Sequence, residues 1–316
     1  MDYFVQQLIN GLNIGAIYAL IALGYTMVYG ILRLINFAHG DVYMVGAFVG
    51  LGLAKLLGYT TSIPGYNADT VGHSLWGGLV LVLVGSMIGA AIIGMAIERF
   101  AYRPVRKYSR MTTLITAIGV SLLIEYLFVA WYGSAQRSFP ALVKNDAIHL
   151  FGDVRISMPQ LIIFGISILL MILLQWIIYK TKIGTAMRAV SFNLNSAKLM
   201  GINTDVVISF TFALGSAMAA AGGVLTAQYN PSIDPLMGII TGLKAFVAAV
   251  LGGIGNIPGA VLGGLVIGVA ETMVVAYGSD IGLASSYRDA VAFTILILVL
   301  LLRPSGLLGS TVQEKV

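Results

Sequence analysis

The chain alternates between long uncharged apolar runs and short polar stretches. The apolar runs lie at about residues 8–31, 42–57, 75–97, 111–131, 159–179, 205–229, 236–251, 260–276 and 290–302. A helix of about 20 apolar residues crosses the hydrocarbon core of a bilayer. The pattern therefore predicts an all-α polytopic membrane protein with about eight or nine transmembrane helices. The runs at 42–57 and 236–251 are short, and either could be partly re-entrant.

Composition excludes a soluble globular protein. Of the 316 residues, 58% are hydrophobic and only 10% are charged, whereas about a quarter are charged in soluble domains. We expect a single transmembrane domain over residues 1–316, without a separate soluble domain. No Lys or Arg precedes Arg33, which argues against a cleaved secretory signal. The net charge of +5 is no indication of nucleic-acid binding, because the basic residues lie in the loops between apolar runs.

The distribution of Lys and Arg predicts the orientation. If the loops near 33, at 99–110 and at 180–203 and the C-terminus face the cytoplasm, twelve of the 18 Lys and Arg residues lie inside. Five lie outside, and Lys244 lies within an apolar run. Because cytoplasmic loops carry an excess of Lys and Arg, the count predicts an N-out, C-in arrangement with nine crossings of the lipid bilayer.

The loop at 180–203 is expected to do more than connect two apolar runs. It carries four basic residues and no carboxylate between two long apolar runs. Gly184 is expected to open a short helix at 185–190, and Ser196 a second at 197–200 that Gly201 closes. Apolar residues at helical spacing give the first helix an apolar side. From these residues alone two interpretations stay open: a protein partner that binds this side, or a basic loop lying on anionic lipid headgroups.

Two polar breaks precede the two short apolar runs. Asn36 and Asp41 flank the first break, and Asn230 and Asp234 the second. In the predicted topology these breaks fall on opposite sides of the membrane. This arrangement is typical of an inverted repeat with interrupted helices, which in transporters marks the substrate path. We expect a first repeat at about 8–132 and a second at about 205–303.

Catalytic motifs are not found in this sequence. It has no G-x-x-x-x-G-K-[ST] phosphate-binding loop, so any ATP hydrolysis belongs to a partner and the chain is not expected to be an enzyme. The absence of cysteine excludes disulfides and thiolate metal sites. His39, His73 and His149 have no metal-ligand spacing, so no metal is expected. The glycines at 252–264 are interpreted as helix-packing positions.

Ionisable residues within apolar runs are costly in a membrane and are often functional. Glu125 lies well inside its run, where it could make a packing hydrogen bond or have a functional role. His39 and Asp41 could line a path or simply cap the second apolar helix. Glu98 is expected to be merely interfacial.

Lys244 and Glu271 are predicted to form a buried ion pair. They lie 13 residues before and 14 residues after the middle of a tight turn near Ile257. Antiparallel helices on either side of this turn would hold both side chains at nearly the same depth, because each residue of a helix rises about 1.5 Å. In the alternative, Lys244 extends toward an interface and Glu271 faces a subunit boundary.

Four motifs carry a resemblance to a known family. They are GLNIGAIYAL at 11–20, NFAHGDVYMVGA at 36–47, GTAMRA at 184–189 together with 197–201, and LGGIGNIPGAVLGG at 251–264. In this order they resemble the LivH-type permeases of branched-chain amino acid ABC importers, over essentially the whole chain. The sequence departs from the family at Asn195, where an acidic residue is expected, and in a longer outer loop around 62–73.

The resemblance implies a type II ABC importer-like fold in the bacterial cytoplasmic (inner) membrane. It also implies four partners besides the bilayer: a homologous second permease of the LivM type, two cytoplasmic ATPases and a periplasmic or lipid-anchored amino-acid-binding protein. No cofactor is expected on this chain, and ATP and Mg²⁺ would bind the ATPases. Permeases for urea or short amides share much of the pattern. A gradient-driven secondary transporter is the other alternative, with Glu125, Lys244 and Glu271 as its deep ionisable groups.

The resemblance also suggests roles for individual residues. The residues expected to couple the chain to an ATPase are Gly184, Thr185, Ala186, Arg188, Ala189, Asn195, Ala197 and Gly201. The two polar breaks and the ionisable residues within or next to the apolar runs, rather than the resemblance, suggest the residues near the translocation path, which are Asn36, His39, Asp41, Glu125, Asn230 and Asp234.

Overall fold

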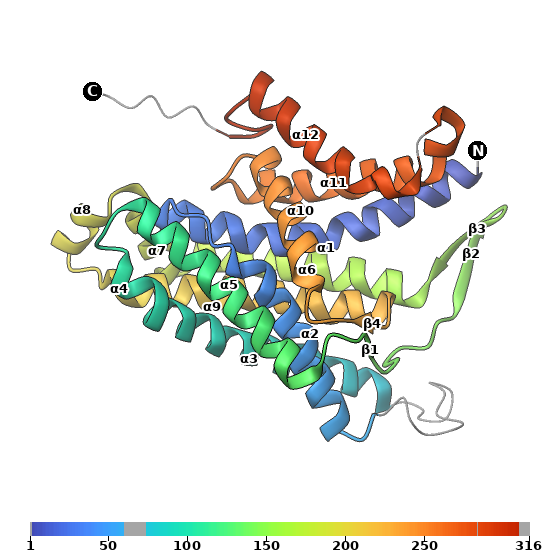
Figure 1. Cartoon of the computed structure of the whole chain (residues 1–316), viewed down its shortest axis with the longest axis horizontal. Helices are drawn as coiled ribbons and strands as arrows, with labels where there is room; N and C mark the ends of the chain where they lie inside the picture. Colours follow the sequence, from blue (N-terminus) through green and yellow to red (C-terminus); the bar gives the residue numbers. More distant parts are fainter. Residues whose placement is uncertain (1, 60–73, 283, 310–316) are drawn as a thin grey trace.

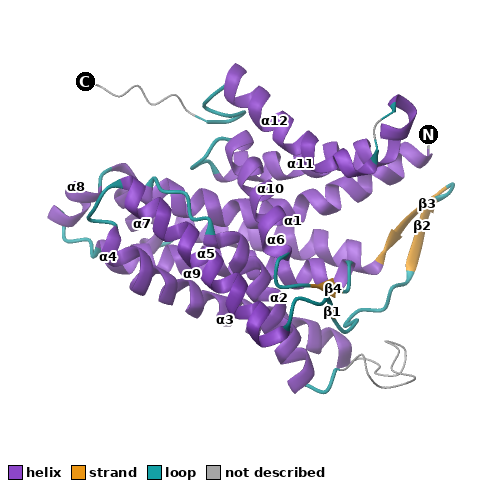
Figure 2. Cartoon of the chain, in the orientation of Figure 1, coloured by secondary structure: helices purple, strands orange, loops and turns teal. Residues whose placement is uncertain are grey.

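The computed structural model describes residues 2–59, 74–282 and 284–309. Helices dominate these ranges (Figures 1 and 2). Each apolar run predicted from the sequence forms a helix, and the bounds are α1 (Asp2–Leu32), α2 (Ala38–Leu56), α3 (Ser74–Ile97), α5 (Arg110–Tyr132), α6 (Met158–Lys180), α9 (Thr204–Tyr229), α10 (Met237–Gly252), α11 (Ile257–Tyr277) and α12 (Arg288–Leu302). The longer outer loop expected around 62–73, with His73, lies outside the described residues.

Within the described residues, six helical segments are long and apolar enough to cross a membrane. They begin at α1, α3, α5, α6, α9 and α11. The helix α10 is apolar but shorter. With six such helices the chain is a multi-pass membrane protein.

Sequence signals at the helix starts explain several of these boundaries. Ser157 and Gln160 form a capping box at the start of α6, which satisfies two backbone groups that the helix leaves free. The Asn256 side chain accepts a hydrogen bond of 3.0 Å from the Gly259 N–H, and Pro258 follows Asn256 in the first turn of α11. Proline fits there because its missing N–H has no partner within the helix.

Shorter elements connect the helices. They are η2 (Glu98–Tyr102, a π-helical turn), α4 (Arg103–Val105), α7 (Lys182–Phe192), α8 (Leu194–Leu199), the 3₁₀ turns η3 (Gly278–Ile281) and η4 (Ser285–Tyr287), and the strands β1 (Arg137–Ser138), β2 (Ala147–Phe151), β3 (Val154–Ser157) and β4 (Ser232–Ile233). The strands β2 and β3 form an antiparallel hairpin. The strand β1 pairs with β4, with Arg137 opposite Ile233, which joins the segment after α5 to the break after α9.

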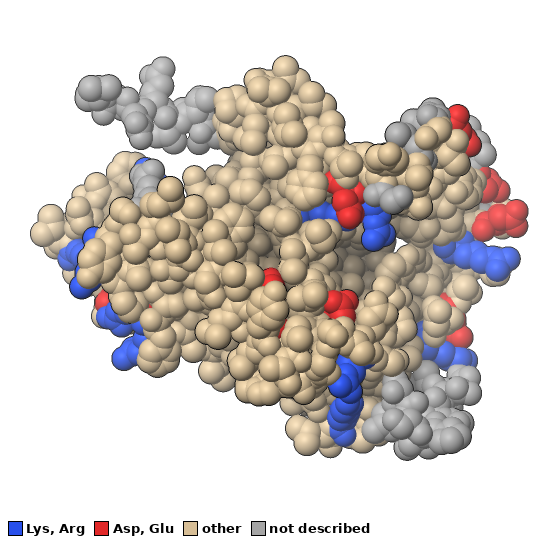
Figure 3. All heavy atoms as spheres, viewed as in Figure 1, with Lys and Arg blue, Asp and Glu red and all other residues tan. Residues whose placement is uncertain are grey.

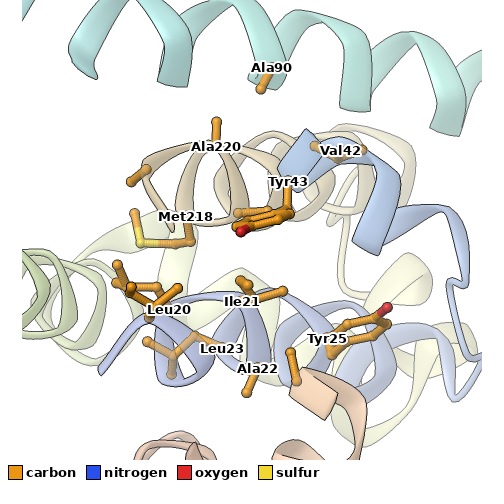
Figure 4. Close-up of a cluster of buried hydrophobic side chains, with 14 of the residues drawn as sticks. Leu20, Ile21, Ala22, Leu23, Tyr25, Val42, Tyr43, Ala90, Met218 and Ala220 are labelled. Atoms are coloured by element: carbon orange, nitrogen blue, oxygen red, sulfur yellow. The ribbon is translucent and has the colours of Figure 1, made fainter. Parts of the chain in front are cut away.

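The helices α1 and α9 form the centre of the molecule. Of the most apolar window of each helix, 83% is buried in α1 and 72% in α9, against 17% in α5 and 28% in α3 and α6. Figure 4 shows Ile21 of α1, Tyr43 of α2 and Ala220 of α9 gathered in this centre. Apolar side chains on the outward faces of α3, α5 and α6 are what contact with lipid requires.

Close approach of α1 and α11 depends on glycine. A Cβ atom at Gly15 would lie 2.7 Å from the Leu265 Cα, and one at Gly264 would lie 2.7 Å from the Ala19 Cα. Such distances leave no space for a side chain. Membrane helices pack through small residues in this way because backbone contact provides the dispersion energy that lipid exclusion does not.

Candidate functional site

Polar residues of the first break are buried around the start of α2. The Tyr102 hydroxyl donates a hydrogen bond of 2.6 Å to the Asn36 Oδ1. The His39 ring lies over Gly24 of α1 with Nε2 3.2 Å from the Ile21 carbonyl oxygen, and it meets the Tyr25 ring edge-to-face at 4.7 Å between centroids. These contacts fix the break against α1 and η2.

Asp41 is directed at α5. Its Oδ2 accepts a hydrogen bond of 2.5 Å from the Ser121 hydroxyl, and its side chain lies near that of Glu125, which is also buried in α5. Capping is not the function of this side chain: Phe37 is the N-cap of α2, and no side chain makes a cap hydrogen bond there. The structure therefore brings Asp41 and Glu125 together.

Residues of the second break have simpler surroundings. Asn230 is exposed and ends α9. The Asp234 Oδ1 accepts a hydrogen bond of 2.9 Å from the Leu236 N–H, just before α10. In the described structure these two residues do not join the Asp41–Glu125 pair.

The two short helices nevertheless meet. A Cβ atom at Gly40 of α2 would lie 2.7 Å from the carbonyl oxygen of Gly238 and 3.0 Å from the Cα of Gly242, both in α10. The segments that follow the two polar breaks are thus in backbone contact. Interrupted helices that lie against each other are found at the binding sites of transporters built from inverted repeats.

Lys244 is buried beside two carboxylates. Its Nζ lies 2.8 Å from the Glu271 Oε1 and 2.6 Å from the Asp289 Oδ1. The Tyr18 hydroxyl donates a hydrogen bond of 2.9 Å to the other oxygen of Glu271. One cluster of charges therefore joins α1, α10, α11 and the start of α12. The sequence-based prediction included Lys244 and Glu271 but not Asp289 or Tyr18.

The loop between α6 and α9 folds into α7 and α8. Both helices begin three residues earlier than predicted, because Thr181 and Asn193 cap them by accepting hydrogen bonds from Gly184 N–H and Ser196 N–H. Gly201, at φ +80°, ends α8 in a Schellman motif: Gly201 N–H and Ile202 N–H bind the carbonyls of Lys198 and Ala197.

The predicted coupling residues fall into two groups on these helices. Gly184 and Ala197 are buried, and Gly184 has no space for a Cβ because the carbonyls of Ile177 and Ile178 lie against it. Thr185, Arg188, Asn195 and Gly201 are exposed, and Ala186 and Ala189 are half-buried.

Three large apolar side chains stand in solvent-exposed positions on this pair of helices and the turn that follows. Phe192 is 89% exposed, Leu199 88% and Met200 82%. Their exposure exceeds that of most apolar residues on the outward faces of the long helices. Exposed apolar groups rimmed by polar residues mark an interaction surface. We call Phe192, Leu199 and Met200 the α7–α8 apolar patch.

Sequence reasoning missed a charged network beside this loop. Glu98 was expected to be interfacial, but it is buried in η2, where it accepts a hydrogen bond of 2.5 Å from the Ser209 hydroxyl of α9. Arg103 and Arg106 both form ion pairs with Asp205, and the Arg106 Nη1 lies 3.6 Å from the Glu98 Oε1. The π-helical turn places Glu98 inward, and no local signal in the sequence indicates that turn. The described residues hold no cluster of three metal-ligating side chains.

Comparison of the sequence with those of known proteins shows which family the chain belongs to. The chain is 43% identical to the high-affinity branched-chain amino acid transport system permease protein LivH of Escherichia coli (strain K12), an alignment that covers 99% of this chain and 98% of that protein. It is 42% identical to the permease protein BraD of the corresponding system of Pseudomonas aeruginosa, with the same coverage of both chains. It is 31% identical to a probable LivH of Methanocaldococcus jannaschii over 92% of this chain and 88% of that one.

A sequence profile of one protein family matches residues 7–300, which include every long helix except the first five residues of α1 and the last two of α12. The four motifs singled out in the sequence lie within the matched range. The chain therefore belongs to the family described as the permease component of the branched-chain amino acid transport system.

Proposed function

We propose that the chain is the membrane-spanning permease subunit of an ATP-driven ABC importer that moves branched-chain amino acids into the cell. The α7–α8 apolar patch is the observation that carries the proposal, because a partner must cover three such exposed side chains outside the long helices. A chain without a phosphate-binding loop needs an ATPase as that partner. The printed names of the LivH and BraD relatives supply the substrate class.

The proposed assembly holds four further subunits. They are a homologous permease of the LivM type, two cytoplasmic ATPases that bind ATP and Mg²⁺, and a periplasmic or lipid-anchored binding protein for the amino acid. We place the chain in the bacterial inner membrane, N-out and C-in, with nine crossings. Support comes from Lys and Arg gathering at the end of the molecule where α4, α7 and α8 lie, while acidic and basic groups mix at the other end (Figure 3).

The proposed path follows the two polar breaks. Two inverted repeats, at about 8–132 and 205–303, would place α2 and α10 in corresponding positions, and their contact through Gly40 supports this. Asn36, His39, Asp41 and Glu125 would lie near the path on one side of this crossing, with Asn230 and Asp234 on the other. Closure of the ATPases would act on the path through α7, which follows α6 after a single residue and contacts α1 and α9.

Transport in liposomes tests this function. Uptake of labelled leucine, isoleucine and valine should require this chain, the second permease, the ATPases, the binding protein and ATP together. Urea and acetamide, offered at the same concentration, should not compete. Uptake by this chain alone down a solute or proton gradient would contradict the proposal and favour a secondary transporter. Competition by urea or acetamide would be consistent with an ATP-driven importer but would contradict branched-chain amino acids as its substrates.

A further inference from the structure

A cavity of about 900 Å³ opens at the end of the molecule that carries α7. The last turns of α1 and α6, the middle of α7, the turn between α10 and α11, and residues beyond α12 form its walls. The membrane-spanning helices end here, so the cavity lies at the depth of the lipid headgroups in whichever leaflet this end faces.

The only charged residues among the described ones that line the cavity are Arg33 and Arg188. The Arg188 guanidinium lies 5.4 Å from the centroid of the Tyr179 ring and donates a hydrogen bond of 3.3 Å to the Thr185 hydroxyl. Neither arginine has an ion-pair partner among the described residues. Arg103 and Arg106, by contrast, are paired with Asp205. Two arginines without a carboxylate create a site for an anion.

The remaining lining favours an amphiphile over a small ion. Met27, Ile31 and Ile254 contribute apolar wall to the cavity, and Tyr29 and Tyr179 also line it. Tyrosine is typical of the membrane interface, where an apolar ring meets polar headgroups. A free phosphate ion would use the guanidinium groups alone and leave most of this volume unused.

We propose that this cavity binds the headgroup of an anionic phospholipid. The phosphate is held by the guanidinium groups of Arg33 and Arg188, which match phosphate oxygens in geometry and charge. The glycerol and the first part of the acyl chains lie on the apolar wall. Because Arg188 and Met187 belong to α7, the lipid contacts the same helix as the proposed coupling surface, and Arg188 lies one helical turn before Phe192 of the α7–α8 apolar patch. The inference requires only that the chain spans a membrane and is independent of the proposed substrate and partners.

Lipid retention by the purified chain tests this site. The chain is delipidated in detergent and titrated with phosphatidylglycerol or phosphatidylcholine, and bound lipid is counted by native mass spectrometry on monodisperse material. We expect a clear preference for phosphatidylglycerol. Arg33→Gln and Arg188→Gln should each weaken its binding about 5-fold and the double variant about 30-fold, given the energy of one arginine near an anionic surface.

Two controls make the result specific. Arg99→Gln removes an exposed arginine that does not line the cavity and should leave binding within about 2-fold. The double variant Arg33→Lys with Arg188→Lys keeps both charges and should retain most binding, which separates lost charge from misfolding. Equal binding of the two lipids, or unchanged binding in the double glutamine variant, would overturn the proposal. Displacement of the lipid by millimolar inorganic phosphate would overturn it in favour of a free anion. If the double glutamine variant no longer co-purified with the ATPase subunits but still bound the lipid, the cavity would instead belong to a protein partner.

Discussion

At the scale of single residues, buried charge gives the sharpest expectations. Lys244 lies beside the carboxylates of Glu271 and Asp289. A buried Lys244 or Glu271 without its partner would be costly at this depth. Lys244→Met should be the most harmful change, because it leaves the buried Glu271 carboxylate without a cation, while Asp289 keeps only its ion pair with Arg288. We expect a loss of about 3–5 kcal/mol in the free energy of unfolding, measured as thermal stability in detergent.

Glu271→Gln should cost less than Lys244→Met, since Asp289 still pairs with Lys244. The double variant Lys244→Met with Glu271→Gln should be more stable than Lys244→Met alone, because the buried Glu271 carboxylate that lost its cation is then replaced by a neutral amide. Strictly additive losses in this double-mutant cycle would contradict the ion pair. The prediction of this pair came from counting residues on either side of a turn, which fixes depth. Asp289 could not be found in that way, because it belongs to a third helix.

Asp41 and Glu125 are buried next to each other, and two neighbouring buried carboxyl groups are expected to share one proton. In Glu125→Gln the amide can donate to the Asp41 carboxylate in place of that proton, and thermal stability should change by less than about 1 kcal/mol. Infrared difference spectra between this variant and the parent should show the loss of one protonated-carboxyl C=O band at neutral pH. Asp234→Asn is the matched control, because Asp234 is half-buried and only accepts from a backbone N–H. If the spectra of Glu125→Gln and the parent were identical in that region, the two carboxyl groups would not share a proton.

At the scale of elements, the contact between α2 and α10 is the feature most sensitive to substitution. Gly40→Ala should destabilise the protein by about 1–3 kcal/mol, because the added methyl meets α10 backbone that cannot move aside. Gly52→Ala in the same helix has open space around it and should be neutral or slightly stabilising. Thermal melts of the two variants, measured side by side, test this contact. Equal stability of the two would mean that α2 and α10 do not meet at Gly40.

The helices of this fold could be predicted because their signal is local. Each apolar run in the sequence became a helix, with ends shifted by at most a few residues except in α1, whose start lies six residues earlier. Capping residues such as Thr181 and Asn193 explain the shifts in α7 and α8. The pairing of β1 with β4 and the turn at Glu98 could not be predicted in this way. Both depend on segments about a hundred residues apart in the chain, and no single stretch carries that information.

The candidate site, too, could be predicted only where its signal is local. Asn36, His39 and Asp41 were singled out because they lie in a polar break between two apolar runs, and Glu125 because it lies inside such a run. Which of them meet was open, and Ser121 and Tyr102, which complete their hydrogen bonds, look like ordinary helix residues in the sequence. The roles of these residues in transport stay predictions.

At the scale of the whole molecule, one end of the bundle is proposed to face the cytoplasm and to bind an ATPase. The sequence has no native cysteine, so a single cysteine can report the exposure of any one position. Phe192 and Leu199 belong to the α7–α8 apolar patch, and Leu56, 85% exposed at the end of α2, is a matched position at the other end of the bundle.

The most direct measurement is labelling of Phe192→Cys, Leu199→Cys and Leu56→Cys by a membrane-impermeant maleimide in oriented vesicles. Positions 192 and 199 should react only in inside-out vesicles stripped of ATPase, and adding the ATPase subunits should slow their labelling at least about 10-fold, as burial in an interface excludes the reagent. Position 56 should react only in right-side-out vesicles, at a rate that the ATPases do not change. Labelling of positions 192 and 199 from the outside, or at rates unaffected by the ATPases, would contradict the account.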